Sequence, residues 1–476
     1  MVFSSVSFLF YFLPLTLGAF FVAPKRLRNL VLMLASLVFY AWGAGGFVVI
    51  LILTTALDFG LGIGMEVARN RGREVWAKVF IATSIVANVG LLAYFKYANF
   101  LVDQLNNTLG QAGTFKIAFG HVILPIGISF FTFQRMSYTI DVYRGRVIPL
   151  RNPIDFFLFV TIFPHQIAGP IIRYHQIADQ LPNHQTTFEK FAAGAVRFSH
   201  GLIKKVIIAD AVGVVVDATF NLPTSQLTTA TAWVGILAYT LQIYFDFSGY
   251  SDMAIGLGYM FGFRIPENFK RPYSAVSITD FWRRWHISLS NWFRDYVYIS
   301  LGGNRVSTAK NYRNLLIVFF LTGLWHGANW TFIVWGLYHG ALLIFEKVTG
   351  IRDATNAGRM RWWRAATVFL FVVGWVPFRA PSMEYALGYL QMMFVPHGGG
   401  IVADVAMTLT PRVVVVMIAA TTVFLLPRWF YIGQWVSNVI SRPAMATRVA
   451  ELGLLLPLSL VIVTTSTFSP FLYFQF

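Results

Sequence analysis

Long apolar runs separated by short basic segments constrain this sequence more than any other feature. Four such runs cover residues 7–22, 30–42, 48–64 and 81–94, and others return after residue 315. A helix that crosses a membrane needs roughly 20 apolar residues. Only 12% of the residues are charged, against about 25% in soluble domains. A soluble core could not bury so much apolar surface. We therefore expect an all-α, polytopic integral membrane protein with about 10–12 membrane helices, some of them re-entrant or interfacial.

The basic residues predict the orientation of the chain in the membrane. The net charge is +17, and the Lys and Arg residues concentrate in short loops. One basic loop contains Lys25, Arg26 and Arg28, and a second covers residues 69–74. Two apolar runs separate these loops, so both lie on the same side, which the positive-inside rule makes cytoplasmic. We therefore expect the N-terminus to be periplasmic or extracellular.

Composition and spacing exclude several classes of function. No recognised module accompanies the positive charge, so nucleic acid is not an expected partner, whereas anionic lipids and a phosphorylated cytosolic cofactor are. The absence of cysteine excludes disulfides and thiolate catalysis. No two of the nine histidines have zinc-ligand spacing, so no metal site is expected. Basic residues follow the first apolar run where a signal peptide would have a cleavage site, so this run is expected to be a retained helix.

One integral membrane domain over residues 1–476 is expected, because no repeat or low-complexity tail divides the chain. Its catalytic core would cover about residues 120–350, and further spans would cover 363–476. The apolar run 156–172 is interrupted by Pro164, His165, Gly169 and Pro170. A broken helix at membrane depth is tolerated only when it is buried in protein or lines a cavity. This run is therefore predicted to be a lining element.

The segment around His286 is rich in tryptophan and arginine. Ser277 followed by Asp280 resembles a capping box, which predicts the start of a helix. One continuous helix from this point would place apolar residues on one stripe. The stripe would contain Trp282, Trp285, Leu289, Trp292, Tyr296 and Ile299.

This pattern has two interpretations. In the first, the helix lies on the membrane surface as an anchor without chemistry. In the second, Arg283 and Arg284 bind the phosphates of a cytosolic cofactor, because the planar guanidinium can bind two oxygens. His286 would then face a cavity, with Trp282 and Trp285 beside the cofactor.

His326 lies deep in an apolar run, where ionisable groups are costly and mark candidate functional sites. Gly323 and Gly327 would let backbone or substrate approach closely. A neutral histidine at this depth can act as a general base, whereas the alternative is a histidine that only bonds a neighbouring helix. Asn329 is a candidate for binding the cofactor. His339 would lie on another face of a continuous helix and ranks lower.

Two carboxylates suggest a different class of function. Asp246 and Asp252 lie in a polar centre between the apolar segments 231–244 and 253–263. Intramembrane carboxylates can relay protons in transporters, but they can also cap broken helices or pair with basic residues. The absence of an inverted repeat argues against a transporter. A scaffold without catalysis is the third hypothesis.

Several strings together resemble one family of membrane enzymes. They are LPIGISF at 124–130, IFPH at 162–165 with AGP at 168–170, YFDFSGYSD at 244–252, WRRWHIS at 282–288 and LWHG at 324–327. These motifs resemble the bacterial, polysaccharide-modifying branch of the membrane-bound O-acyltransferases, and most of all the membrane subunits of alginate O-acetyltransferases. The resemblance extends from residue 2 to residue 380.

The resemblance implies a fold, a reaction and a set of site residues. It implies a helical fold around a central tunnel in the bacterial inner membrane, with acetyl-CoA as a donor substrate and no permanently bound cofactor. Acetyl groups would pass to an extracytoplasmic polysaccharide such as alginate or cellulose, with the help of periplasmic acetyltransferases and the polysaccharide synthesis machinery. His326 matches the catalytic histidine, and His286 matches a second functional position. The candidates for the tunnel lining are Gln134, His165, Asp246, Tyr250, Ser251 and Asp252.

Overall fold

The computed structural model describes residues 1–111, 117–351, 357–426 and 451–465, which form helices and loops with no strand among them. This confirms the all-α prediction. Within these residues, four helical segments are long and apolar enough to cross a membrane: 25–44, 47–70, 74–110 and 330–349. Shorter apolar helices cover 7–22, 411–424 and 452–465. Other apolar runs lie in helices that are shorter, such as 128–143, or less apolar over their length, such as 308–326, so fewer spans are selected than the run count predicts.

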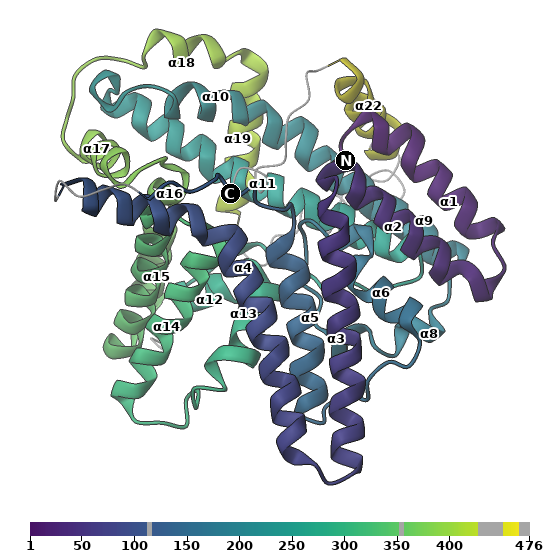
Figure 1. Cartoon of the computed structure of the whole chain (residues 1–476). Coiled ribbons are helices and arrows are strands. Elements are labelled where there is room, and N and C mark those ends of the chain that lie inside the picture. The colour runs from purple at the N-terminus through teal and green to yellow at the C-terminus, as the bar shows by residue number, and fades with distance from the viewer. Residues whose placement is uncertain (112–116, 352–356, 427–450, 466–476) are drawn as a thin grey trace. The chain divides into compact units, whose positions relative to one another are not determined.

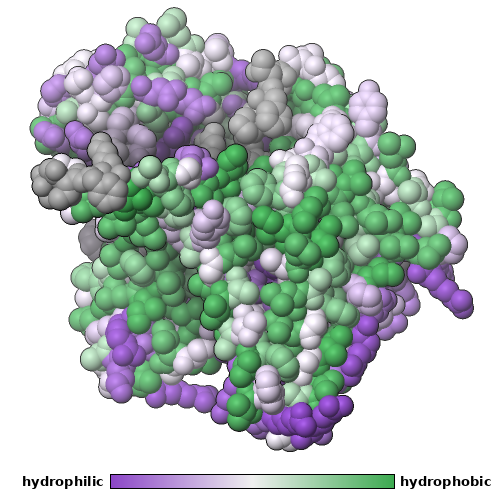
Figure 2. Space-filling view, in the orientation of Figure 1, coloured by the Kyte–Doolittle hydropathy of each residue, from purple (hydrophilic) through white to green (hydrophobic). Residues whose placement is uncertain are grey.

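The chain folds into two compact units, residues 1–191 with 258–266 and residues 192–257 with 267–476. The helices of the first unit (Figure 1) are α1 (Leu13–Val22), α2 (Arg28–Ala44), α3 (Phe47–Asn70), α4 (Glu74–Gln111), α5 (Ile128–Tyr143), α6 (Pro153–Thr161), α7 (Tyr174–Ile177) and α8 (Gln180–Asn183). Figure 2 shows apolar residues over most of the visible surface of α3 and α4, and hydrophilic residues where the two helices join.

A buried polar network connects α3, α4 and α5 in the first unit. The carboxylate of Asp58 accepts hydrogen bonds from Ser84 at 2.6 Å and from Asn88 at 2.9 Å. The Nε of Arg135 lies 3.8 Å from the same carboxylate. Buried charges are tolerated when they are paired and hydrogen-bonded, so this network fixes the register of three helices at membrane depth.

The run 156–172 is broken, as the sequence predicts. Helix α6 ends at Thr161, a 3₁₀ turn covers Phe163–His165, and a loop follows. The side chain of Gln134 on α5 lies 2.6 Å from Nδ1 of His165, and both residues are fully buried. The broken segment is therefore buried in protein and bonded to α5.

The second unit contains the remaining helices. The longer ones are α10 (Asp210–Phe220), α11 (Thr229–Met260), α14 (Thr308–His326), α15 (Trp330–Thr349), α16 (Ala357–Arg379), α17 (Met383–Phe394) and α19 (Pro411–Leu425). The shorter ones are α12 (Ile278–Trp282), α13 (Ile287–Phe293), α18 (Ala403–Thr408) and α22 (Leu456–Thr465). Helix α9 (Phe188–Ile203) begins in the first unit and continues into the second.

Helix α11 runs without a break through the polar centre 246–252. The apolar segments 231–244 and 253–263 that flank this centre therefore lie largely on one helix, which ends at Met260. Gly249 faces α9, and a Cβ there would lie 2.8 Å from the carbonyl oxygen of Gly201. The glycine thus serves close packing of two helices and does not end one.

Helices α14 and α15 form an antiparallel pair joined by a short loop (Figure 1). A Cβ at Gly323 would lie 2.3 Å from the carbonyl oxygen of Phe332, and one at Gly336 would lie 2.2 Å from that of Phe319. Gly336 and Gly340 have the spacing of small residues at close helix contacts in membranes. The predicted close backbone approach at Gly323 is confirmed.

Candidate functional site

The segment that carries His286 begins as the sequence predicts. Helix α12 starts after Ser277, whose hydroxyl accepts a hydrogen bond from the N–H of Asp280 at 3.1 Å. The carboxylate of Asp280 accepts the N–H of Val276, also at 3.1 Å, and not that of Ser277. One of the two reciprocal bonds of the predicted capping box is therefore present.

A carboxylate from α15 holds the start of α12. Glu346 is fully buried and accepts the backbone N–H groups of Ile278 at 2.6 Å and Thr279 at 2.8 Å. It also accepts Nε1–H of Trp363 at 2.8 Å. A carboxylate at a helix N-terminus satisfies donors that have no partner within the helix. Sequence reasoning missed this anchor because its partners are distant in the chain.

The prediction of one continuous helix through His286 is wrong. Helix α12 ends after Trp282, the backbone of His286 adopts a left-handed φ of 43°, and α13 begins at the next residue. The N–H of Ile287 donates to the carbonyl of Asn268 at 3.0 Å, which holds the break in place. Non-glycine residues at positive φ are uncommon and cluster at functional sites where the surroundings hold them.

The expected surface stripe is buried inside the second unit. Its buried members are Trp282, Trp285, Leu289, Trp292 and Tyr296, whereas Ile299 is exposed. A helix that lay on the membrane surface would present these rings to lipid. The interpretation as a simple surface anchor is therefore wrong, and the segment packs as part of the core.

The side chain of Asn268 orients His286. Its Oδ1 lies 3.2 Å from Nδ1 of His286 and accepts the hydroxyl of Ser288 at 2.9 Å. Its Nδ2 donates to the hydroxyl of Ser251 on α11 at 3.2 Å. Because the amide oxygen only accepts, Nδ1 carries the proton and Nε2 can accept one. Burial lowers the pKa of His286 to about 3, so the ring is neutral at physiological pH.

His326 is the last residue of α14 and is 6% exposed. Its ring is 5.1 Å from that of Trp335 and 5.0 Å from that of Phe378, measured between centroids. A Cβ at Gly327 would lie 2.2 Å from the ring of Phe332, so any larger residue directly after the histidine would have to displace that ring. His326 is thus held in an aromatic cage where the chain turns from α14 to α15.

The structure brings the two histidine segments together within the second unit. The ring of Trp325 lies 5.8 Å from that of His286 and 4.9 Å from that of its neighbour His326. The ring of Phe247 on α11 also packs against His286, with 4.8 Å between the ring centroids. The two segments therefore share one aromatic neighbour, which their separation in the sequence did not establish.

The residues predicted to bind the donor lie in different settings. Arg284 bonds Asp280 at 2.9 Å and the carbonyl of Lys270 at 3.2 Å, whereas Arg283 is exposed. The side chain of Asn329 caps α15. Its oxygen accepts the N–H of Thr331 at 3.1 Å, and its nitrogen donates to the carbonyl of Pro381 at 3.0 Å. Arg284 and Asn329 therefore make bonds that stabilise the fold, and the donor contacts of all three residues stay predictions.

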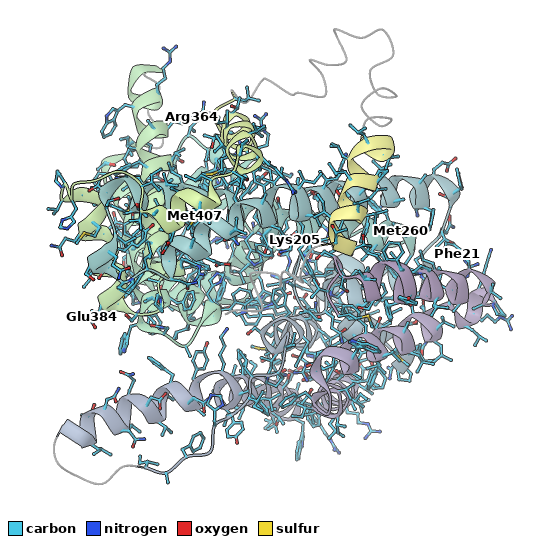
Figure 3. All side chains as sticks on the ribbon, turned by 90° about the horizontal axis from the view of Figure 1, so that it is seen from above. Phe21, Lys205, Met260, Arg364, Glu384 and Met407 are labelled. Carbon is cyan, nitrogen blue, oxygen red and sulfur yellow. The ribbon has the colours of Figure 1, made fainter. Side chains whose placement is uncertain are left out.

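The two carboxylates of the polar centre are paired with basic residues. Lys205, labelled in Figure 3, lies 2.7 Å from the carboxylate of Asp246. Asp252 is 2.6 Å from Lys204 and 2.6 Å from Arg197. Such pairing is the structural alternative that the sequence left open. It gives no support to a proton relay through these residues.

The remaining candidates for a tunnel lining are also buried. Tyr250 lies in the core of the second unit, where Ser251 contributes the bond to Asn268. Gln134 and His165 belong to the first unit and bond each other. Their predicted role in a tunnel stays a prediction.

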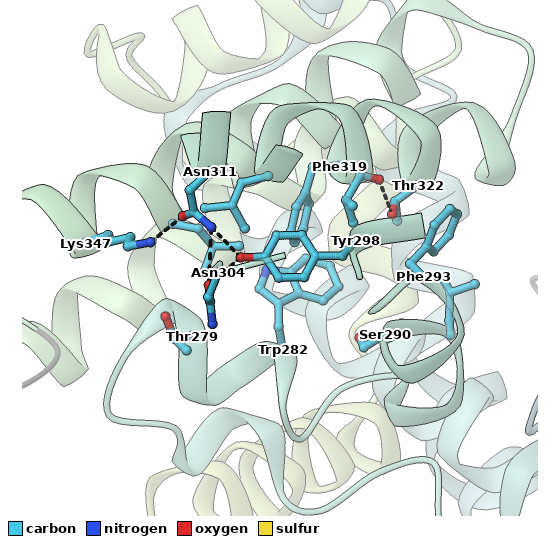
Figure 4. A pocket seen from close by; sticks show the side chains of 14 residues that line it. Thr279, Trp282, Ser290, Phe293, Tyr298, Asn304, Asn311, Phe319, Thr322 and Lys347 are labelled. Carbon is cyan, nitrogen blue, oxygen red and sulfur yellow. Dashed lines mark hydrogen bonds between the residues drawn. The ribbon is translucent and has the colours of Figure 1, made fainter. Parts of the chain in front are cut away.

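A cavity of about 230 Å³ lies in the second unit between α12, α13, α14 and α15 (Figure 4). It is lined by Thr279, Trp282, Leu289, Ser290, Phe293, Tyr298, Asn304, Asn311, Leu315, Val318, Phe319, Thr322, Leu343 and Lys347. The α14 members lie at positions 311, 315, 318, 319 and 322 and so form one face of the helix. At 1.5 Å per residue this face is about 16 Å long.

The cavity has a polar end and an apolar end. Figure 4 shows Lys347, Asn311 and Asn304 at one end, and Thr322 and Phe293 at the other. At the polar end, Lys347 donates to the side-chain oxygen of Asn311, whose Nδ2 donates to the hydroxyl of Tyr298 at 2.6 Å. Among the described residues Lys347 has no carboxylate partner, so its charge can attract an anionic group.

Neither candidate histidine lines this cavity, but aromatic rings connect its wall to His326. Trp282 forms part of the wall, its ring is 5.8 Å from that of Trp335, and Trp335 contacts His326. The Nε1 of Trp282 is buried and has no hydrogen-bond partner among the described residues. His326 lies one helical turn after Thr322 on α14, so the face of α14 that lines the cavity continues toward the histidine.

Sequence comparisons identify relatives along the whole chain. The family model for the membrane-bound O-acyltransferases matches residues 146–376. The protein named probable alginate O-acetylase AlgI from Azotobacter vinelandii is 46% identical over the full length of both chains. The protein of the same name from Pseudomonas putida is 45% identical, also over both full lengths.

More distant relatives carry other names. The peptidoglycan O-acetyltransferase of Helicobacter pylori is 37% identical over 84% of this chain and 80% of its own. The teichoic acid D-alanyltransferase of Bacillus subtilis is 33% identical over 48% of this chain and 61% of its own. The three names describe the transfer of an acetyl or a D-alanyl group in connection with alginate, peptidoglycan or teichoic acid.

Proposed function

The chain belongs to the membrane-bound O-acyltransferase family, and from this premise we propose that it transfers acetyl groups from cytoplasmic acetyl-CoA across the bacterial inner membrane. The acceptor is an extracytoplasmic polysaccharide, alginate or cellulose. The similarity over the whole length to two relatives named alginate O-acetylases supports alginate. The N-terminus is periplasmic, and a periplasmic acetyltransferase together with the polysaccharide synthesis machinery completes the transfer.

The observation that carries the mechanism is the face of α14 that lines the cavity and leads to His326. We assign the cavity to the extended arm of the donor, with its polar end at Lys347 and its thioester toward the histidine. The α14 face of about 16 Å is long enough for the extended arm of acetyl-CoA, and the apolar wall suits the uncharged part of that arm. The exposed Arg283 is available for the phosphates of the donor outside the cavity.

His326 is the general base of the proposed reaction. It accepts the proton of the acceptor hydroxyl as the oxygen bonds to the thioester carbonyl carbon. The carbon–sulfur bond then breaks, and the proton passes from the imidazole to the departing sulfur, which leaves as a thiol. A buried base that is neutral before the reaction can take this proton, and general-base catalysis typically contributes about 10²–10⁴-fold. His286, held by Asn268, orients the donor.

Reconstitution in liposomes tests this function against the transporter and the scaffold. The purified chain would receive radiolabelled acetyl-CoA on one side and alginate oligosaccharides on the other. We expect release of free CoA thiol that depends on the chain, and acetyl ester on the oligosaccharide when the periplasmic acetyltransferase partner is supplied on the acceptor side. Label that crosses with its thioester intact would establish a transporter instead, and thiol release no faster than in empty liposomes would favour the scaffold.

A further inference from the structure

The end of α5 in the first unit is shaped by a helix-terminating glycine. Gly145 has a left-handed φ of 67°, and its N–H bonds the carbonyl of Val142 at 3.0 Å. The N–H of Arg146 donates to the carbonyl of Asp141, also at 3.0 Å. These two bonds define a Schellman motif, which glycine favours because it adopts positive φ without strain. The turn directs Arg146 back over Asp141.

The carboxylate of Asp141 holds two donors side by side. One oxygen lies 2.7 Å from Nδ1 of His175 on α7, and the other lies 3.6 Å from the guanidinium of Arg146. The side chain of Asp141 is fully buried, whereas those of His175 and Arg146 are 31% and 42% exposed. A buried carboxylate that orients partly exposed donors fixes their direction in advance, which lowers the cost of binding a ligand.

These two donors face a cavity of about 730 Å³ that also contains side chains from the end of α3. Arg69 in this wall donates to the carbonyls of Val142 and Tyr143, which terminate α5. The cavity is within the usual size range of small-molecule sites, about 300–1,000 Å³. Helix α3 is long and apolar enough to cross a membrane and ends at Asn70, so the cavity lies at the end of a candidate span.

The wall of the cavity contains both arginines and carboxylates. Arg69, Arg146 and Arg151 line the cavity together with the carboxylates of Glu66 and Asp179. Arg151 is bonded to Glu66, and Arg69 is bonded to carbonyls. The guanidinium left for a ligand is therefore that of Arg146, and the partly exposed ring of His175 lies on the same carboxylate beside it.

We propose that the Arg146–His175 pair, held by Asp141, is a binding site for a phosphate group. The planar guanidinium offers two parallel N–H groups to phosphate oxygens, and the ring of His175, held through Nδ1 on Asp141, presents its other nitrogen to the phosphate. The phosphate belongs to the headgroup of an anionic phospholipid or to a soluble phosphorylated molecule. This site is independent of the acetyl transfer proposed for the second unit.

Binding by the purified full-length chain tests the proposal and separates the two sources. In the lipid arm, native mass spectrometry would count phosphatidylglycerol and phosphatidylcholine molecules retained by the detergent-solubilised chain. In the soluble arm, equilibrium dialysis would measure binding of radiolabelled inorganic phosphate and of adenosine 3′,5′-bisphosphate. The variants are Arg146→Gln and His175→Gln, since glutamine keeps a donor for Asp141 at position 175. The control is Arg71→Gln, which removes the same charge from an exposed position outside the cavity.

We expect both site variants to weaken binding of one class of ligand by about tenfold each, because each removes a charge-assisted hydrogen bond. Arg71→Gln should leave that binding unchanged. Loss confined to phosphatidylglycerol identifies a lipid site, and loss confined to the soluble probes identifies a soluble ligand. Equal weakening by all three variants would show that only the surface charge matters and would overturn the proposal. Unchanged binding in the two site variants would overturn it as well.

Discussion

At the scale of single residues, the candidate site depends on side chains that the sequence did not distinguish. His326 is recognisable because a histidine deep in an apolar run is rare and costly, and His286 is recognisable because its segment is rich in tryptophan and arginine. Asn268 is not recognisable, since it lies in a loop without a motif, yet it bonds His286, Ser288 and Ser251. The left-handed backbone at His286 was equally hidden, because only a small share of non-glycine residues adopt that conformation, even among the types enriched in it.

Replacing Asn268 tests whether it orients His286. In Asn268→Ala, His286 and Ser251 each lose a buried partner, and an unsatisfied buried group costs about 1–3 kcal/mol. We expect acetyl transfer to fall by roughly tenfold or more through kcat, which corresponds to about 1.4 kcal/mol. The rate would be measured with the reconstituted chain. Asn221→Ala, at an exposed helix end, should leave it unchanged. Equal kcat in both variants would refute the orienting role.

At the scale of helices, the sequence predicts where elements begin better than how they pack. The start of α12 and the break after α6 follow from capping residues and prolines, which act locally. The break between α12 and α13 and the continuity of α11 depend on contacts with distant segments, such as the loop at Asn268 and the glycines that join α9 to α11. Periodicity alone could predict neither of them.

Gly323→Ala should disrupt the pairing of α14 with α15. The added Cβ would lie 2.3 Å from the carbonyl oxygen of Phe332, which is backbone and cannot move without shifting the helix. Overpacking of this kind costs about 1–3 kcal/mol. We expect a lower midpoint of thermal unfolding in detergent. Gly90→Ala is the matched control, because nothing lies within 4 Å of its Cβ and alanine favours a helix. A Gly323→Ala midpoint no lower than that of the control would contradict this packing.

Lys347→Gln tests the polar end of the cavity between α14 and α15. If Lys347 attracts the donor, removing its charge should raise KM for acetyl-CoA with little change in kcat. The lost contact would have stabilised the bound donor and the transition state equally. The expected increase is about tenfold, typical of a charge-assisted hydrogen bond. Lys310→Gln removes the same charge from an exposed position outside the cavity and should not alter KM. Similar KM values in the two variants would show that the donor does not use this end.

At the scale of the whole molecule, composition predicted the class of protein, and motifs predicted the family. The low charge and the apolar runs require a membrane protein with an all-α fold, which the structure and the relatives confirm. The strings around His286 and His326 pointed to an acyltransferase, and the full-length relatives agree. The division into two units and the phosphate site of the first unit could not be predicted, since both depend on residues brought together by folding.

The central claim is that His326 takes the proton of the acceptor during acetyl transfer. Single-turnover transfer from radiolabelled acetyl-CoA, measured for the reconstituted chain alongside the binding of the donor, tests it most directly. For His326→Ala we predict unchanged donor binding and a rate lower by about 10²–10⁴-fold, whereas His397→Ala, an exposed histidine, should transfer at the wild-type rate. Transfer by His326→Ala at a rate close to that of the wild type would contradict the account.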